Sequence, residues 1–215
     1  MLKISDALAK IVDVNDFLKA GLAHRLFNLS QLSRYLKPLI EARLQKEVKE
    51  SAILMNLSRM QRDYSKSYKF TDQFLVEKIS VQANLFTATF AKSPVLHKQV
   101  NQFYKWIQKF KGFISISESS KEITIIVEVG FLERMPEFIK ADPIFIKKNL
   151  TGIGVQFDAE YTKTPGFLYL VLQKTTLQGV NLIEVFSTYT EFMIFVDHED
   201  TKLAFDTLYS CFKGF

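Results

Sequence analysis

One order of secondary-structure elements occurs twice in the last two thirds of this chain. In each copy, an alternating, strand-like stretch is followed by a helical pattern, two more strands and a second helix. The first copy comprises a strand at 76–91, a helix from Ser93-Pro94 to Gly112, strands at 112–119 and 122–130, and a short helix at 131–139 interrupted by Pro136. The second comprises a strand at 151–157, a helix at 165–178, strands at 180–190 and 191–198, and a helix from Glu199 to Phe212. This order predicts two antiparallel, ferredoxin-like sheets, each with both helices on one face.

The sequence offers a candidate for the last strand of one sheet but not of the other. Residues 143–150 can supply it for the first copy, but no strand-like stretch follows Phe212 for the second. An open edge exposes unpaired N–H and C=O groups, and proteins usually cover such edges. We therefore expect either that the two copies interlock or that the chain forms a homodimer that completes the sheets.

The first 66 residues contain no strand-like alternation and read as four helices. Their expected starts and ends are Ser5 or Asp6 to Val12, Asn15 to Phe27, Asn28 or Ser30 onward with a break or kink at Pro38, and Val48 to Tyr64. The apolar stripes are Leu32, Leu36 and Leu39 on the third helix, and Ile53, Leu57 and Met60 on the fourth. The whole chain is thus expected to be α+β, with a helical, helix-turn-helix-like head at 1–66 and βαββα(β) modules at 67–148 and 149–215.

The net charge of +5 is unevenly distributed along the chain. Residues 1–66 hold 12 basic and 7 acidic side chains, whereas residues 151–215 hold 4 and 8. On the fourth expected helix, four polar side chains fall on one side: Asn56, Arg59, Arg62 and Lys66. Arg and Asn are the side chains that read guanine and adenine edges, so DNA is one candidate partner of the head. Solvated helix faces produce the same pattern, and a head used for dimerisation or for docking a protein is the competing interpretation.

Groups that carry chemistry are sparse in this sequence. The three histidines, His24, His97 and His198, are far apart and do not have the spacing of a zinc site. Gly152-Ile-Gly154 lacks the third glycine of a dinucleotide-binding loop, and Cys211 lies among apolar residues of the last helix. We therefore expect no catalytic residues, no metal and no cofactor. A single cysteine fits a reducing cytosol, and no apolar run reaches the roughly 18 residues of a membrane span, so we expect a cytoplasmic protein that does not contact membranes.

The second copy contains the most specific motif of the chain. Pro165-Gly166 begins its helix, Gly179-Val-Asn-Leu leads into the next strand, and Ser187-Thr-Tyr-Thr-Glu forms the expected hairpin. A Pro-Gly start permits a tight turn with little side-chain bulk. It leaves free backbone N–H groups at the positive end of the helix dipole, which suits a carboxylate.

These three stretches resemble the ACT domain, a regulatory module that senses small molecules, and most closely the paired ACT domains at the C-terminus of aspartate kinases. The resemblance covers residues 149–212 well and residues 76–148 only in element order, and residues 1–66 do not resemble a kinase domain. It implies an amino-acid site at Thr164, Pro165, Gly166, Phe167, Val180, Asn181, Leu182 and Ile183. In the first copy, Phe113 replaces the Asn and the loop before the helix lacks glycine, so this copy is expected to serve as a packing partner.

Three interpretations of function follow. The first is a non-enzymatic regulatory protein that senses an amino acid through tandem ACT domains and passes the signal to a helical head, which in one version binds DNA. The second is a regulatory subunit that docks on an enzyme of amino-acid metabolism. The third, a small enzyme on a ferredoxin-like scaffold, is disfavoured by the missing catalytic groups.

Overall fold

The computed structural model describes residues 3–67, 74, 76–164 and 166–212, and the chain divides into two compact units at 1–73 and 74–215. Pro165, which begins the expected ligand loop, lies outside the described residues. Within the described ranges, the helices are too short or too polar to cross a lipid bilayer.

The described part of the first unit is helical, and its helices are α1 (Ile4–Val12), α2 (Asp16–Ala23), α3 (Leu29–Leu44) and α4 (Glu50–Ser67). Two expected caps are confirmed, because Asn15 accepts the N–H of Leu18 at 3.1 Å and Asn28 accepts those of the first turn of α3. The expected cap at Ser5 or Asp6 is wrong, since α1 already begins at Ile4. Asp6 instead accepts the N–H of Lys3 at 3.3 Å, where a carboxylate complements the helix dipole.

Two helices of the head differ in extent from the sequence expectation. Helix α2 ends at Ala23 rather than Phe27, because Arg25 adopts a left-handed conformation with φ 56°. Helix α3 continues through Pro38. The buried side chains of Leu36 and Ile40, before and after the proline, hold both turns against the core, and such packing outweighs the lost backbone hydrogen bond.

Helix α4 supplies the centre of the head core. Ile53 and Leu57 are fully buried and Met60 packs against the same cluster, which confirms the expected stripe. At its other end, the hydroxyl of Tyr64 donates to the carboxylate of Asp13, just after α1. Burial and this neighbouring carboxylate raise the pKa of Tyr64, so the phenol stays protonated and continues to donate.

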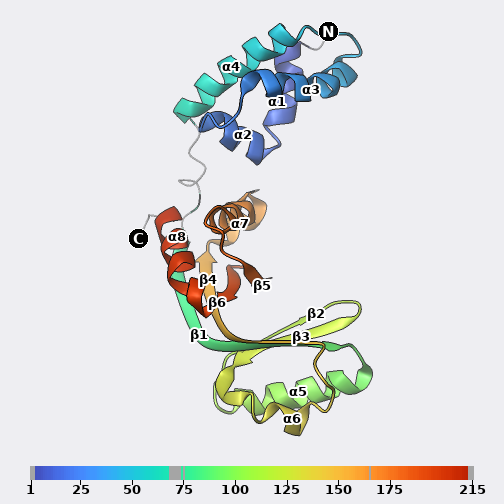
Figure 1. The fold of residues 1–215 in the computed structure, drawn as a ribbon, viewed down its shortest axis with the longest axis vertical. Helices are drawn as coiled ribbons and strands as arrows, with labels where there is room; N and C mark the ends of the chain where they lie inside the picture. Colours follow the sequence, from blue (N-terminus) through green and yellow to red (C-terminus); the bar gives the residue numbers. More distant parts are fainter. Residues whose placement is uncertain (1–2, 68–73, 75, 165, 213–215) are drawn as a thin grey trace. The chain divides into compact units, whose positions relative to one another are not determined.

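The described strands of the second unit form one antiparallel sheet in the order β2-β3-β1-β4-β6-β5. The strands are β1 (Val76–Ala91), β2 (Ile114–Glu118), β3 (Glu122–Glu128), β4 (Phe145–Phe157), β5 (Leu182–Ser187) and β6 (Glu191–Asp197). The helices between and after them are α5 (Pro94–Gln108), α6 (Met135–Phe138), α7 (Phe167–Leu177) and α8 (Thr201–Cys211), with 3-10 turns η2 (Val129–Phe131), η3 (Ala159–Lys163) and η4 (His198–Asp200). The sheet is bent into two arms, and α5 and α6 cover one arm while α7 and α8 cover the other (Figure 1).

Strands β1 and β4 belong to both arms. They pair with each other from Val76 opposite Phe157 to Thr89 opposite Phe145. The second half of β1 also pairs with β3, and the second half of β4 pairs with β6. The first half of β1 therefore supplies the strand that the second copy lacks after Phe212, and the expected interlocking of the copies is confirmed.

A single strand, β4, replaces the two strands expected at 143–150 and 151–157, so the expected module boundary at 148/149 falls inside it. Asn84 and Asn149 mark the middle of the two long strands, with φ of 57° and 59°. The β1–β4 register shifts around Leu85, which follows Asn84, and both strands bend sharply in Figure 1. Bulges of this kind let one strand turn from one arm into the next without losing its pairing.

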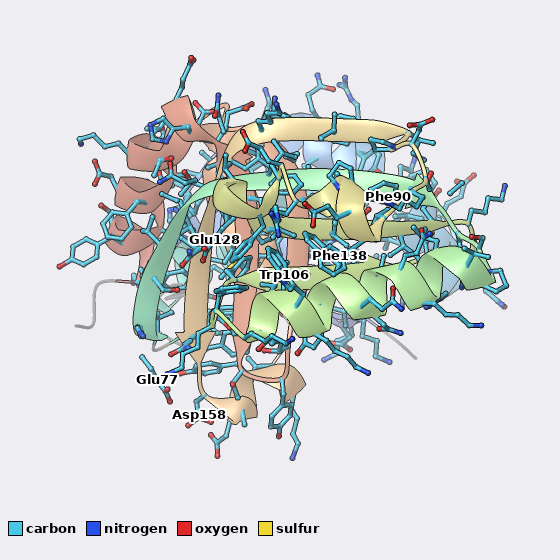
Figure 2. The ribbon with its side chains drawn as sticks, turned by 90° about the horizontal axis from the view of Figure 1, so that it is seen from below. Glu77, Phe90, Trp106, Glu128, Phe138 and Asp158 are labelled. Atoms are coloured by element: carbon cyan, nitrogen blue, oxygen red, sulfur yellow. The ribbon has the colours of Figure 1, made fainter. Side chains whose placement is uncertain are left out.

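Each arm has its own core on the helix-covered face. In the first arm, Phe90 and Phe103 are fully buried, and the ring centroid of Trp106 on α5 lies 5.2 Å from that of Phe138 on α6 (Figure 2). Val95, in the first turn of α5, and Phe110, after the helix ends at Gln108, are 65% and 60% exposed, and the buried stripe of α5 consists of Leu96, Val100, Phe103 and Ile107. Pro136 stands in the first turn of α6 and begins that helix rather than interrupting it.

A third cluster joins the two arms on their other faces. Leu85 and Leu150, which pair with each other, are fully buried there beside Ile126 of β3 and Phe195 of β6. Ile125, the neighbour of Ile126, belongs to the helix-covered core instead, as alternation along a strand requires. The two arms are therefore packed against each other and share their strands.

Candidate functional site

The loop that leads into α7 is shaped by aromatic packing. Gly166 is the N-terminal cap of α7 with φ 108°, a conformation that favours glycine. Phe167, the first residue of the helix, is buried with its ring 4.4 Å from that of Phe157 and stacked at 6.3 Å on that of Tyr161. The loop is thus held by rings at the end of β4, and the N-terminus of α7 has a fixed direction.

A pocket of about 310 Å³ lies beside this loop. Its other wall is the turn between β5 and β6, where Ser187, Thr188 and Tyr189 are exposed. The complete lining is Phe157, Tyr161, Thr164, Gly166, Phe167, Leu168, Tyr169, Ser187, Thr188 and Tyr189. We call this the α7 pocket. It combines an aromatic floor with several hydroxyl groups, which suits a small molecule with an apolar part and a polar part.

The structure separates the two halves of the site that the resemblance implied. Thr164, Gly166 and Phe167 line the α7 pocket, but residues 180–183 follow the opposite end of α7. A helix of 11 residues is about 16 Å long, so the two stretches do not meet at one cavity in this chain. Asn181 is exposed, and Ile183 packs against the cluster that joins the arms.

Sequence reasoning missed the turn at residues 187–189 as a wall of the pocket. The Ser-Thr-Tyr stretch was visible as a hairpin signal. Its position opposite the start of α7 depends on the pairing of β6 with β4, which begins at Gln156 opposite Glu191. That pairing places the β5–β6 turn beside the end of β4.

The first arm has a corresponding place, where the exposed side chain of Glu118 is bonded to two basic side chains. In the β2–β3 turn the N–H of Ser119 bonds to the carbonyl of Glu122 at 2.9 Å, just as Thr188 bonds to Glu191 at 2.8 Å in the β5–β6 turn. Glu118 therefore corresponds to Ser187. Its carboxylate forms ion pairs with Lys92 and, at 3.0 Å, with Nε2 of His97 on α5.

This ion-pair cluster changes the chemistry of the first arm. The hydrogen bond from Lys92, aided by His97, lowers the pKa of Glu118, so the carboxylate stays charged. Lys92 also donates to the carbonyl of Ser119 at 3.3 Å. The loop before α5 and the β2–β3 turn are thereby tied together, whereas the hydroxyl of Ser187 leaves the α7 pocket open.

Three observations on the described residues concern the groups that could carry chemistry. No three His, Cys, Asp or Glu side chains among them converge on a metal position. Burial raises the pKa of Cys211, which disfavours the reactive thiolate, although Lys174 acts in the other direction. Glu184 and Glu191 are not opposite each other, because Glu184 pairs with Phe195 and Glu191 with Gln156.

On the head, the residues proposed for DNA contact are only partly available. The amide of Asn56 donates to the carbonyl of Ala52 at 2.8 Å, so one of its N–H groups is engaged by its own helix. Arg59, Arg62 and Lys66 are exposed on α4. Their contact with DNA stays a prediction.

No protein-family model and no curated protein sequence matches this chain. Solved structures do. The regulatory subunit of aspartate kinase from Thermus thermophilus, in its ligand-free form, matches with a TM-score of 0.53 and 10% identity over 64% of this chain and 99% of that one. A structure of aspartokinase alpha and beta subunits matches with a TM-score of 0.51 and 12% identity, over 64% of this chain and 98% of that one.

The aspartate kinase of Clostridium acetobutylicum, described as an allosteric enzyme, matches with a TM-score of 0.52 and 12% identity over 65% of this chain. This chain spans only 35% of the length of that enzyme. At such identities the likeness concerns the fold. The curled antiparallel sheet with its helices has the fold found in regulatory subunits of aspartate kinases, which is the architecture that the sequence resemblance implied.

Proposed function

We propose that this chain is a regulatory protein without catalytic activity, which binds an amino acid in the α7 pocket. The observation that carries the proposal is the contrast between the two arms. The pocket between the α7 loop and the turn at 187–189 is open, whereas in the first arm Glu118 binds Lys92 and His97 at the corresponding place. The fold shared with regulatory subunits of aspartate kinases supports a regulatory role.

The chemistry of the α7 pocket fits an amino acid. Backbone N–H groups at the N-terminus of α7 attract a carboxylate, and the Phe157 and Phe167 rings offer an apolar surface for a side chain. Hydroxyls of Thr164, Ser187 and Tyr189 line the pocket and are able to bond the ligand's ammonium group. Its volume of about 310 Å³ is at the lower end of the range for ligand pockets, which favours an amino acid over a nucleotide.

A second candidate function keeps the same site but assigns the response to another protein. The match with the Thermus structure covers 99% of that chain, which is the regulatory subunit of an aspartate kinase. In this second version, the chain is a regulatory subunit that docks through its head on an enzyme of amino-acid metabolism. Homodimerisation is compatible with both versions, because β2 and β5 form the two ends of the described sheet order.

The test is a thermal-shift screen of the full chain against the twenty amino acids, followed by calorimetry on any that stabilise it. A ligand that binds only the folded state raises the apparent stability by about 2.7 kcal/mol at a hundred times its Kd. Ser187→Glu, which copies the first arm, and Tyr189→Ala should both weaken binding, while Tyr35→Ala on the head should not. If no amino acid stabilises the protein, or if binding survives both pocket variants, the proposal is wrong.

A further inference from the structure

A second and larger hollow lies where the two long strands bend. Its volume is about 750 Å³, and it shares no residue with the α7 pocket. Its walls come from three separate stretches, namely Asn84 on β1, residues 147–150 on β4 and residues 197–200 at the end of β6 and in η4. We call this hollow the bend cavity.

Six of the eight polar side chains that line the bend cavity have no side-chain partner among the residues that the structure describes. Lys147 and Asp197 form an ion pair at 2.8 Å. Among the described residues, no side-chain hydrogen bond or ion pair joins the remaining six polar ones to the protein: Asn84, Lys148, Asn149, His198, Glu199 and Asp200. Most of these side chains are exposed, and polar groups that line one hollow without internal partners are available to a polar ligand.

The corresponding position in the first arm is satisfied internally. Leu85 opposite Glu128 matches Leu150 opposite Asp197 in the two copies, so Glu128 corresponds to Asp197. The carboxylate of Glu128 accepts the side-chain amide of Gln82 at 3.3 Å and the N–H of Phe113 at 3.0 Å. In both copies this carboxylate is therefore bonded within the protein, to Gln82 and Phe113 in the first arm and to Lys147 in the second, so the groups left for a ligand are the neighbours of Asp197.

The charges of the bend cavity select among ligand classes. A metal ion is disfavoured, because no three acidic or histidine side chains among the described residues converge on one point. A phosphate would meet Glu199 and Asp200 as well as Lys148, and like charges repel. A molecule with a positive and a negative end satisfies both sets of side chains.

We propose that the bend cavity binds a small zwitterion whose opposite charges are separated along a chain. The anionic end pairs with Lys148 on β4, and the cationic end pairs with Glu199 and Asp200 in η4. The amides of Asn84 and Asn149 supply further hydrogen bonds between them. Because β1, β4 and η4 all contribute, the bound molecule joins the two shared strands to the segment that precedes α8.

The test uses calorimetry on the full chain with a series of unbranched amino acids: glycine, 3-aminopropanoate, 4-aminobutanoate, 5-aminopentanoate and 6-aminohexanoate. We expect affinity to peak at one chain length. Pentanoate and pentylamine, which carry one charge each, should bind about tenfold more weakly or worse, since each loses one charge-assisted contact. Equal affinity for the whole series and for the singly charged molecules would overturn the proposal.

Variants locate the binding. Lys148→Gln and the double variant Glu199→Gln, Asp200→Asn should each lower the affinity by about tenfold. Lys98→Gln and Glu133→Gln remove the same charges from exposed positions elsewhere and should leave it unchanged. Ser187→Glu should also leave it unchanged, which separates this site from the α7 pocket. Binding that ignores the cavity variants, or that is lost in Ser187→Glu, would show that the zwitterion binds elsewhere.

Discussion

Gly152 on β4 lies directly opposite Phe195 on β6, and a Cβ atom on Gly152 would stand 2.9 Å from Cε1 of that ring. Gly154 is equally crowded, with the side chains of Ser80 and Glu191 at 2.7 and 2.8 Å from its Cβ position. The two glycines that resemble part of a nucleotide-binding loop are therefore packing residues. Because these glycines have no side chains, Phe195, Met193 and Glu191 of β6 can pack directly against β4.

Gly152→Ala should destabilise the second unit by about 1–3 kcal/mol, because the new methyl group displaces a fully buried ring. Chemical denaturation measures the loss. Gly130→Ala is the matched control, since no atom lies within 4 Å of its Cβ position and its φ is not positive. Equal stability of the two variants would contradict the packing role.

Thr87→Val should stabilise the fold by about 1–2 kcal/mol. The hydroxyl of Thr87 is buried and has no hydrogen-bond partner among the described residues, so its removal relieves a desolvation cost. Thr175→Val should do the opposite, because that equally buried hydroxyl donates to the carbonyl of Val171 at 3.0 Å. Thermal melting of both variants gives the signs, and a loss of stability in Thr87→Val would show that the hydroxyl is satisfied.

Glu184→Gln should stabilise the protein at neutral pH and have little effect near pH 4. Burial raises the pKa of the Glu184 carboxyl in the fold, so the unfolded chain ionises more readily. Stability is therefore lost as pH rises from the unfolded value of about 4.3 through the raised value, and the glutamine variant escapes this loss. Urea denaturation of both proteins across pH 4–8 measures it. A stability difference that does not change with pH would contradict the assignment.

Fragments 74–148 and 149–215 should each fail to fold, while 74–215 folds. The first fragment loses most of β4, and the second loses the first half of β1, which pairs with the second half of β4. Each would expose an unpaired strand edge and part of the cluster around Leu85 and Leu150. Amide NMR dispersion decides the outcome, and a well-dispersed spectrum from either fragment alone would refute the shared-strand account.

The exposed cations of α4 predict DNA binding that weakens as salt rises. Arg59→Ala with Arg62→Ala should lower the slope of log K against log salt by about two, one for each lost phosphate contact. The control is Lys10→Ala with Arg43→Ala, which removes the same charge from other exposed positions of the head. Fluorescence anisotropy with a labelled duplex measures both. Absence of binding at low salt, with and without amino acids, would leave the head as a docking or dimerisation element.

Local signals in the sequence were sufficient for much of the fold. Asn15 and Asn28 cap their helices as expected, and 76–91 is one strand with the expected bounds, because caps and alternation depend on neighbouring residues. The missing strand after Phe212 predicted either interlocking copies or a dimer, and the shared strands are the first of these. That β1 provides it, and that β4 is continuous, follows from long-range pairing that no short window of sequence contains.

In the candidate site, too, local motifs were predicted and features that depend on long-range pairing were missed. The loop with Thr164, Gly166 and Phe167 was found from its motif, and it lines a pocket. Tyr189 and the rest of its turn were missed as pocket residues because their place depends on the register between β4 and β6. The bend cavity could not be foreseen, since it unites Asn84 with residues 147–150 and 197–200 across the sheet.

The shared strand β1 also sets the order in which the protein can be completed during synthesis. Residues 76–82 leave the ribosome early, but their partners around Val155 and Phe157 follow only after the whole first arm. At ordinary translation rates the wait is on the order of ten seconds. During that time half of β1 has an open backbone and the apolar side chains of Val76 and Val81, so a nascent chain needs protection at this point. The stretch that later closes the second arm is thus made long before the strand with which it pairs.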